Sequence, residues 1–388
     1  MNGASTTKHS LPLSGIRVLD MSRVLAGPLC AMMLGDLGAD VIKIERPGAG
    51  DDTRGWGPPF DDQGRSAYYL CSNRNKLSVA ADLSVPADAE LVRKLILEAD
   101  VVVENFLPGS LDRRGVGPLD LLSAEPRLVW CTLTGFGAES PRPGYDFVVQ
   151  AESGWMAITG EPDGEPMKIG VALADVIAGK DAVAAILALL TARERGTLSA
   201  DESHRHVTIS LLQSATAALV NVAQNVLVSG EDAGRWGNAH PNLSPYQLFH
   251  AADAPVVIAV GSDAHWLLCA RALGLDDLAA DEALRTNRGR LAQRARIVGA
   301  IAARVRTSTA AHWIAVLEGA GVPCGVVKRV KDAVTSAGGS AITGIPPATQ
   351  GEVRLPPPLL DEHGTLVRAR GWKAFENASP IVGPRSSL

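Results

Sequence analysis

The sequence has few cysteines, and no two of them lie close together in the chain. Five occur among 388 residues, all far apart and without a C-x-x-C pair. An odd number of isolated cysteines argues against a disulfide framework, and the missing C-x-x-C pairs argue against a zinc site. We therefore expect a chain without disulfides and without a bound metal.

Long apolar runs and clusters of basic residues are also absent. The longest apolar stretches, such as residues 182–190, are shorter than the ~20 residues that a membrane-spanning helix needs, and the N-terminus shows no signal-peptide pattern. The net charge is −5 and the basic residues are scattered, which argues against a nucleic-acid-binding surface. We expect a soluble, cytoplasmic protein without membrane or nucleic-acid partners.

The glycine pattern of dinucleotide-binding proteins is missing as well. The first strand-to-helix turn reads SRVLAGP (22–28), not G-x-G-x-x-G. That motif needs its glycines so that a pyrophosphate can approach the backbone at a helix N-terminus. Glu45, at the end of the second strand, resembles a ribose-binding acid. Without the glycines, however, the sequence argues against a nicotinamide-dependent dehydrogenase.

What is present is a long chain with 46% hydrophobic residues, enough for about two or three domains. Its first part alternates short apolar strands with helices, as in the strand 16–20, the helix 27–38 and the strand 40–45. The alternation continues with strands at 77–83, 100–105 and 127–137 and a helix at 87–98. It predicts an α/β domain with a Rossmann-like parallel sheet and right-handed crossovers.

A second, smaller α/β domain is expected after a linker. Residues 231–247 are rich in turn residues, and two strand-like runs follow at 246–251 and 255–261. Further helices are expected at 211–230, 263–273 and 309–319. The expected boundaries are a large domain at 1–200 completed by 325–388, a linker at 201–235 and a small domain at 236–324.

One carboxylate lies at the boundary between two segments of the chain that differ in pattern. Asp175 stands between a run of small apolar residues and an Ala/Leu-rich stretch with helical spacing. Asp is a favoured N-cap residue, because its side chain accepts hydrogen bonds from the free N–H groups of the first turn. The same place also suits a reactive carboxylate, because a helix N-terminus carries partial positive charge. The residues alone leave both interpretations open.

Five longer segments match one known family, in the same order along the chain. They are LSGIRVLDMSRVLAGPLCAMMLGDLGADVIKIERPGAGDDTR (13–54), ADVVVENFLPGSLDRRGVG (99–117), TGFGAESPRPGYDFVVQAESGWMAITG (134–160), ALADVIAGKDAVAAILALL (172–190) and GNAHPNLSPYQLF (237–249). Together they resemble the class III CoA-transferase family, which includes formyl-CoA and carnitine CoA-transferases and, as relatives, 2-methylacyl-CoA racemases. The resemblance implies a homodimer in which each chain is an open ring threaded through the other.

The resemblance also implies roles for individual residues. Asp175 matches the family's nucleophile, which attacks an acyl-CoA thioester to form an anhydride and then carries CoA as an aspartyl thioester. Coenzyme A, as the substrate and product thioester, is the cofactor implied. The positions that match residues along the CoA path or beside the thioester are Leu25, Ala26, Arg46, Asn105, Phe106, Leu107 and Arg113. Tyr145 is a further candidate to pack on CoA or to form a hydrogen bond with it.

Three places depart from the family pattern. Leu25 stands where formyl-CoA transferases have Gln, which argues against a donor as small as formyl. Tyr145 replaces the His of the racemases' Gly-His-Asp sequence, and Tyr, with an ordinary pKa of about 10, is a poor base at neutral pH. Residues 235–247 contain a single glycine where formyl-CoA transferases have a glycine loop. That segment looks more like the members acting on dicarboxylic or longer acids.

The expected activity is CoA transfer from an acyl-CoA donor, such as succinyl-CoA or another dicarboxylyl-CoA, to a carboxylic acid. His240 is a candidate contact to the acceptor carboxylate, although a turn histidine held by the backbone explains it equally well. Two alternatives remain, a 2-methylacyl-CoA racemase and a CoA-binding protein without catalytic activity.

Overall fold

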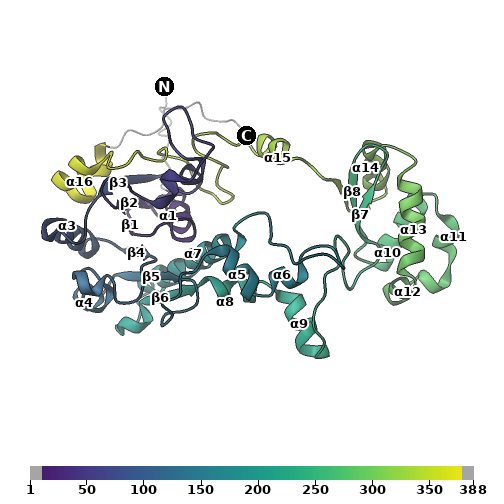
Figure 1. The fold of residues 1–388 in the computed structure, drawn as a ribbon, viewed down its shortest axis with the longest axis horizontal. Coiled ribbons are helices and arrows are strands. Elements are labelled where there is room, and N and C mark those ends of the chain that lie inside the picture. Colours follow the sequence, from purple (N-terminus) through teal and green to yellow (C-terminus); the bar gives the residue numbers. More distant parts are fainter. Residues whose placement is uncertain (1–10, 378–388) are drawn as a thin grey trace, which may run out of the picture. The chain divides into compact units, whose positions relative to one another are not determined.

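The computed structural model describes residues 11–377, and its largest element is a parallel sheet of six strands (Figure 1). The strands lie in the order β3-β2-β1-β4-β5-β6, and each neighbouring pair is parallel. Their bounds are β1 Arg17–Asp20, β2 Asp40–Glu45, β3 Lys76–Ala80, β4 Val101–Glu104, β5 Val129–Thr134 and β6 His206–Ser210. The α/β class with a parallel sheet, expected from the sequence, is confirmed.

Helices cover both faces of this sheet, because its strands are apolar on both sides. Val101 and Val103 of β4 face one layer of helices, whereas Val102 faces the other. A parallel sheet buried on both faces requires this pattern. The first layer contains α1 (Ala26–Asp36), α7 (Leu173–Glu194) and α8 (Leu211–Ala217), and the second contains α3 (Pro86–Leu97), α4 (Pro118–Ala124) and α16 (Gly364–Arg370).

The order of strand addition reverses between β1 and β4. From β1 the chain adds β2 and β3 on one side, and it then returns to add β4, β5 and β6 on the other. In open α/β sheets the loops that follow two such neighbouring strands lead away from each other and leave a crevice at the carboxyl ends. The loops after Asp20 and Glu104 therefore mark the place where a ligand is expected.

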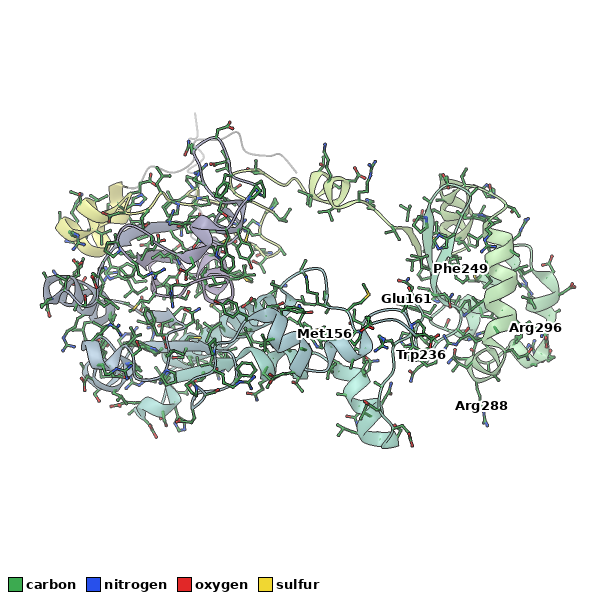
Figure 2. All side chains as sticks on the ribbon, in the orientation of Figure 1. Met156, Glu161, Trp236, Phe249, Arg288 and Arg296 are labelled. Atoms are coloured by element: carbon green, nitrogen blue, oxygen red, sulfur yellow. The ribbon has the colours of Figure 1, made fainter. Side chains whose placement is uncertain are left out.

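The chain divides into two compact units, each with its own core. Of the described residues, 11–155, 168–224 and 334–377 form the unit that holds the parallel sheet, and 156–167 and 225–333 form the second unit. The second unit contains an antiparallel sheet of β7 (Tyr246–His250), β8 (Pro255–Ala259) and β9 (Cys324–Val326). Phe249 of β7, labelled in Figure 2, belongs with Trp266 and Trp313 to the core of this unit.

Shorter helices complete the structure. Those within the second unit are α10 (Asp263–Ala272), α11 (Asp276–Ala280), α12 (Asn287–Ala292), α13 (Arg294–Val305) and α14 (Ala310–Gly319). The others are α2 (Ala67–Leu70), α5 (Asp146–Glu152), α6 (Trp155–Ile158), α9 (Val220–Ser229) and α15 (Val330–Ser336). Turns of 3₁₀ helix lie at Asp52–Gly55, Asp112–Arg114, Glu202–His204, Glu282–Leu284 and Gly371–Asn377.

The sequence predicted one helix over 211–230, whereas the structure has two. α8 ends at Ala217 and α9 begins at Val220, whose φ of 41° lies in the left-handed region that interrupts an α-helix. The two helices are bent by 71°. Within residues 11–377 no single helix is long and apolar enough to cross a membrane, although this bent pair passes the same test of length and composition.

The segment expected to be a linker, 201–235, contributes to the parallel sheet. Its strand β6 pairs with β5 from the Trp130 and His206 pair to the Thr134 and Ser210 pair. The sequence showed a strand-like run here but not its partner, because pairing with β5 depends on contacts across more than seventy residues of chain. The segment therefore belongs largely to the first unit.

Asn75 holds the C-terminal segment against the first unit. Its side-chain Oδ1 accepts hydrogen bonds from the N–H groups of Arg354 (2.6 Å) and Leu355 (2.8 Å). Farther along, the N–H of His363 donates to the carbonyl oxygen of Ser78 at 3.0 Å. The tail therefore packs beside β3 through backbone contacts, which its irregular, Pro-rich sequence can make without a core of its own.

Candidate active site

Two adjoining cavities lie at the carboxyl ends of the parallel strands. The first, of about 340 Å³, is lined by residues that follow β1, β4 and β5, together with Asp175. The second, of about 520 Å³, is lined by segments that follow β1, β2, β3 and β4. Arg23, Phe106 and Leu107 line both, so the loops after β1 and β4 join the two cavities. They lie where the reversed strand order predicts a ligand.

Asp175 lies in the first turn of α7, but it is not the N-cap. The helix begins at Leu173, and the cap position is Ala172, which has no capping side chain. Instead, Asp146 Oδ1 accepts hydrogen bonds from the N–H groups of Ala174 (2.8 Å) and Asp175 (3.4 Å). The capping interpretation of Asp175 is therefore wrong, because a carboxylate from α5 satisfies this helix end. The side chain of Asp175 is left for another partner.

A close approach of α1 to α7 supplies that partner. Gly179 follows Asp175 by about one helical turn and so lies on the same face of α7. A Cβ atom at Gly179 would lie 2.7 Å from the carbonyl oxygen of Ala26, so glycine is what allows the first turn of α1 to come this near. The N–H of Ala26 donates to the Asp175 carboxylate. The positive end of α1 therefore faces this carboxylate.

Burial and a second carboxylate control the protonation of Asp175. Burial raises its pKa, and the negative charge of Asp146 raises it further, to about 7, while the hydrogen bond from Ala26 opposes both effects. A carboxylate with this pKa is ionised above neutral pH and yet is poorly solvated. Poor solvation makes the oxygen a better nucleophile than that of an exposed aspartate.

Most of the residues that the resemblance assigned to CoA lie around these cavities. Those that share the first cavity with Asp175 are Ala26, Asn105, Phe106, Leu107 and Tyr145. Asn105 fastens the loop after β4 to the loop after β1, since its Oδ1 accepts the N–H of Arg23 at 3.0 Å and its Nδ2 donates to the carbonyl oxygen of Arg23 at 2.8 Å. Tyr145 is 59% exposed, so its ring is available to a ligand.

The other expected residues are more scattered. Arg46 lines the second cavity and pairs with Asp52 at 2.5 Å. Leu25 precedes α1, is 9% exposed and lines neither of the two cavities. Arg113 lines a third cavity, of about 640 Å³, whereas Arg114 lines both the second and the third. The structure thus brings Arg114, and not Arg113, to the second cavity.

Sequence reasoning missed two arginines of the first cavity. Arg142 stacks on Phe136, with 3.8 Å between the guanidinium carbon and the ring centre, and pairs with Glu152 at 2.5 Å. Arg23 lies over Phe106 at 5.8 Å and lines both cavities. Scattered arginines carry no pattern of their own, and only the loop positions after β1 and β5 could have singled them out.

Tyr68, on α2, is a third residue that the sequence analysis missed. Burial raises its pKa to about 12, and the negative charges of Asp175 and Asp146 contribute to the rise. Its ring meets Trp56 edge to face, with 5.0 Å between the ring centres. The phenol is therefore neutral at physiological pH and able to donate a hydrogen bond beside the nucleophile.

His240 lies in the second unit, in the turn-rich segment before β7. Its Nδ1 accepts the N–H of Asn242 at 3.0 Å, and its carbonyl oxygen accepts from Arg294 at 2.9 Å. Its ring meets that of Tyr246 edge to face, at 5.2 Å. These are the contacts of a turn histidine held by the backbone, and a contact with the acceptor acid stays a prediction.

Cysteines and acidic residues form no further site in the part of the chain that the structure describes. All five cysteines are free thiols. Among residues 11–377, no group of three or more His, Cys, Asp or Glu side chains is placed to hold a metal ion.

Comparisons with known proteins agree with this geometry. The family model described as CoA-transferase family III matches residues 13–369. The chain is 42% identical over 329 residues to succinyl-CoA:glutarate CoA-transferase of Mus musculus, covering 84% of this chain and 74% of that protein. It is also 42% identical to succinate–glutarate CoA-transferase of Agrobacterium fabrum, covering 83% and 81%. The crystal structure of a CAIB/BAIF family protein from Brucella suis matches with a TM-score of 0.80 at 39% identity, covering 93% of this chain and 99% of that one.

The raised pKa of Asp175 predicts a pH-dependent gain in stability for Asp175→Asn. Folding raises this pKa from the ordinary value of 3.8 to about 7, so the native state loses stability from this group as pH rises between those values. The melting temperature of the variant, minus that of the wild type, should therefore grow with pH over this range and level off above it. Asp181→Asn, a change at an exposed carboxylate on the same helix, is the control. A difference for Asp175→Asn that does not vary with pH would contradict the raised pKa.

Proposed function

Because the chain belongs to CoA-transferase family III, we propose that it moves CoA from succinyl-CoA or another dicarboxylyl-CoA to a carboxylic acid acceptor. The observation that carries this proposal is the position of Asp175, a poorly solvated carboxylate that faces the first turn of α1 in a cavity joined to a larger one. Of the two relatives that are 42% identical, one is named for succinyl-CoA and glutarate and the other for succinate and glutarate, which supports a dicarboxylic substrate.

Asp175 begins the reaction as the nucleophile. Its carboxylate oxygen attacks the thioester carbonyl of the donor, the C–S bond breaks, and a mixed anhydride and CoA thiolate form. The thiolate then attacks the aspartyl carbonyl of the anhydride and releases the donor acid, which leaves CoA on Asp175 as a thioester. The N–H of Ala26 and the positive end of α1 face the Asp175 carboxylate, which supports a role in stabilising the negative charge that develops when the thiolate attacks the aspartyl carbonyl.

The second half of the reaction repeats these steps in reverse order. The acceptor carboxylate attacks the aspartyl carbonyl of the Asp175 thioester, which releases the thiolate and forms a second anhydride. The thiolate attacks the acyl carbonyl of that anhydride, giving the product thioester and restoring the Asp175 carboxylate. No net proton is taken up or released, so the site needs no general acid or base beyond groups that stabilise oxyanions.

The second cavity suits the nucleotide end of the CoA thioester. Arg46 and Arg114 line it, and arginine binds phosphate through parallel N–H groups. The passage from this cavity to Asp175 runs along Arg23, Phe106 and Leu107, which line both cavities. We assign the phosphates to the arginine-lined cavity and the thioester to the cavity of Asp175.

Arg142 is the residue that we assign to the free carboxylate of a dicarboxylic acid. It lines the cavity of Asp175 but not the second cavity, so its charge is close to the acyl group and away from the proposed phosphate site. Among the described residues, its only ion pair is with Glu152, and both side chains of this pair are partly exposed. A substrate carboxylate can therefore replace Glu152 as the partner of Arg142.

Trapping tests the covalent intermediates. Incubation with succinyl-CoA and hydroxylamine should convert Asp175 to its hydroxamate, detectable in the peptide mass spectrum, because both the anhydride and the aspartyl thioester react with this amine. Asp175→Ala should form no hydroxamate and lose at least about 10³-fold in kcat, whereas Asp181→Asn should behave as the wild type. An active enzyme whose Asp175 stays unmodified with every donor would exclude the mechanism.

Substitution of Arg142 tests the choice of substrate. Arg142→Gln should lower kcat/KM for glutarate relative to butyrate by about tenfold to a hundredfold, since a charge-assisted hydrogen bond contributes roughly 1.5–3 kcal/mol. Arg127→Gln is the control, because Arg127 is also an exposed arginine paired with a glutamate, Glu194. An unchanged glutarate-to-butyrate ratio in Arg142→Gln would remove Arg142 from substrate recognition.

We also propose the interlocked homodimer that the family resemblance implies. The chain passes between its two units four times, at residues 155–156, 167–168, 224–225 and 333–334, as a threaded ring requires. Helix α9 exposes Val220, Leu227 and Val228 at 70%, 77% and 78%, which is a large apolar surface for an unpartnered helix.

Subunit exchange distinguishes an interlocked dimer from an ordinary one. Light scattering should give twice the mass of one chain, and mixing two differently tagged dimers should give no mixed dimer until the protein is unfolded and refolded. A monomer, or mixed dimers formed under native conditions, would contradict the threaded arrangement.

A further inference from the structure

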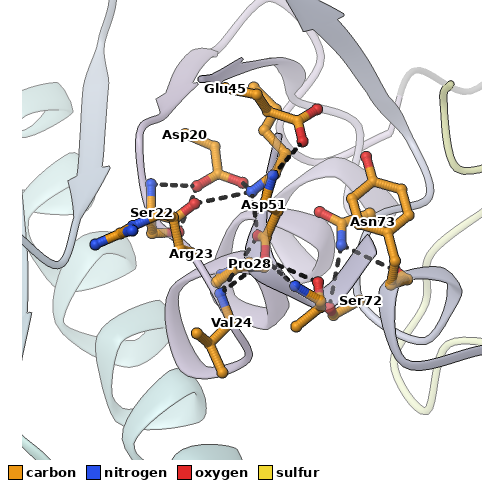
Figure 3. A network of polar contacts seen from close by, with 12 residues as sticks. Asp20, Ser22, Arg23, Val24, Pro28, Glu45, Asp51, Ser72 and Asn73 are labelled. Carbon is orange, nitrogen blue, oxygen red and sulfur yellow. Dashed lines mark hydrogen bonds and ion pairs between the residues drawn. The ribbon is translucent and has the colours of Figure 1, made fainter. Parts of the chain in front are cut away.

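Two lysines lie completely buried behind the loop that carries the Ala26 N–H. Lys43 of β2 and Lys76 of β3 have side chains with 0% exposure, as does Asp20 at the end of β1. A buried ammonium group is costly unless its hydrogen bonds and its charge are satisfied. Most of the contacts that satisfy these two lysines lead to the loop 22–28 or to residues that hold it, and Figure 3 shows the polar network around this loop.

Lys76 uses all three of its donors within the protein. Its Nζ lies 2.8 Å from Asp20 Oδ2, 2.8 Å from the carbonyl oxygen of Pro28 and 2.9 Å from Asn73 Oδ1. Pro28 belongs to the first turn of α1, the turn that begins with Ala26. Lys76 therefore ties this end of the loop to the sheet.

Lys43 fixes the other end of the same loop. Its Nζ donates to the carbonyl oxygen of Ser22 at 2.8 Å and pairs with Asp51 Oδ2 at 3.1 Å. Both oxygens of Asp51 in turn lie 3.3 Å from the N–H of Val24. Val24 has a φ of 73°, in the left-handed region that a β-branched residue rarely adopts. The loop therefore has a conformation that its own sequence disfavours.

The loop is also closed on itself. A Cβ atom at Gly27 would lie 2.3 Å from the Cβ of Ser22, so the two ends of the turn are in contact. Ala26 lies between these fixed points, and the direction of its N–H follows from them. A shift of the loop would therefore move the donor away from Asp175.

From this geometry we propose that Lys43 and Lys76 are positioning residues, which hold the loop 22–28 in the conformation that aims the Ala26 N–H at Asp175. The proposal rests on the proposed function only in that Asp175 is the nucleophile. It assigns a catalytic purpose to a buried ionic network in which Lys43 and Asp51 also line the second cavity, whereas Asp20 and Lys76 line neither cavity. Misplacement of a group by about 1 Å far from the chemistry can cost on the order of 10²-fold in rate.

The two buried lysines differ in how far nearby carboxylates compensate their positive charge. Burial lowers the pKa of Lys76 to about 8, with Lys43 adding to this and Asp20 opposing it. For Lys43, the attraction of Asp20, Asp51 and Glu45 exceeds the effect of burial, so its pKa is raised. Glu45 is itself held by Arg54 at 2.6 Å. The positive charge of Lys43 is therefore better compensated than that of Lys76.

Lys76→Met and Asp51→Asn test the proposal in the full-length enzyme. Both variants should lower kcat by about tenfold to a hundredfold. Lys76→Met, at a residue that lines neither cavity, should change the KM for acyl-CoA by less than about twofold. Loss of the Ala26 hydrogen bond should also move the acidic limb of the pH–rate profile to higher pH, because that bond favours the ionised Asp175. Hydrogen exchange of the peptide covering 22–28 should become faster.

Asp36→Asn is the matched control. It breaks another buried ion pair of the same unit, with Arg74 at 2.7 Å, which does not touch the loop. It should lower the stability of the protein without shifting the acidic limb of the pH–rate profile and without speeding hydrogen exchange of the peptide covering 22–28. If Lys76→Met does not fold, the Asp51→Asn variant tests the proposal by itself. Asparagine keeps an acceptor for the Val24 N–H but removes the negative charge that pairs with Lys43.

The outcomes separate this proposal from the proposed function. Formation of the Asp175 hydroxamate in the wild type is established first, and its absence would count against the nucleophile and not against the lysines. With the hydroxamate present, variants with faster exchange of 22–28 but wild-type kcat and pH limb would overturn the positioning role. Variants that resemble Asp36→Asn in every readout would overturn it as well.

Discussion

The close contact between the first turn of α1 and the first turns of α7 is the constraint on which the site depends. Gly179 leaves room for the carbonyl oxygen of Ala26, and Asp175, on the same face of α7, then receives the N–H of that residue. The contact joins two helices of one layer on the sheet, so the sheet fixes both. A carboxylate is thereby held at a positive helix end while its pKa stays near neutrality.

The buried ion pairs beneath this contact make the stability of the fold sensitive to the loss of any one partner. Removing one partner of a buried ion pair typically costs roughly 3–5 kcal/mol, a large share of the ~5–15 kcal/mol that stabilises an ordinary domain. Apolar side chains could fill the same space without that risk. Lysines reach across from β2 and β3 to carbonyl groups of the loop, however, which apolar residues cannot do.

Much of the fold could be predicted from local sequence, and the site only in part. The strands 40–45 and 100–105 were found because buried parallel strands are continuous apolar runs, and both agree with the structure within a residue or two. The capping role of Asp175 failed because the cap comes from Asp146, about thirty residues earlier in the chain. The single helix over 211–230 failed because its apolar spacing does not reveal the left-handed Val220.

The binding residues show the same division between local and distant information. Asn105, Phe106 and Leu107 were found through the resemblance, and they line the cavity of Asp175 because the loop after β4 must open at that edge of the sheet. Arg114 and Arg142 were missed, because which arginine of a loop turns toward a cavity depends on the packing of that loop, such as Arg142 on Phe136.

Oxygen transfer to Asp175 tests the central claim, that this carboxylate carries the acyl group and CoA in turn. In a single turnover with succinyl-CoA and glutarate labelled in both carboxylates with oxygen-18, the bridging oxygen of the second anhydride comes from glutarate and remains on Asp175. The peptide containing Asp175 should therefore gain the mass of one oxygen-18 in place of oxygen-16. Formation of glutaryl-CoA with no label in that peptide would contradict the account.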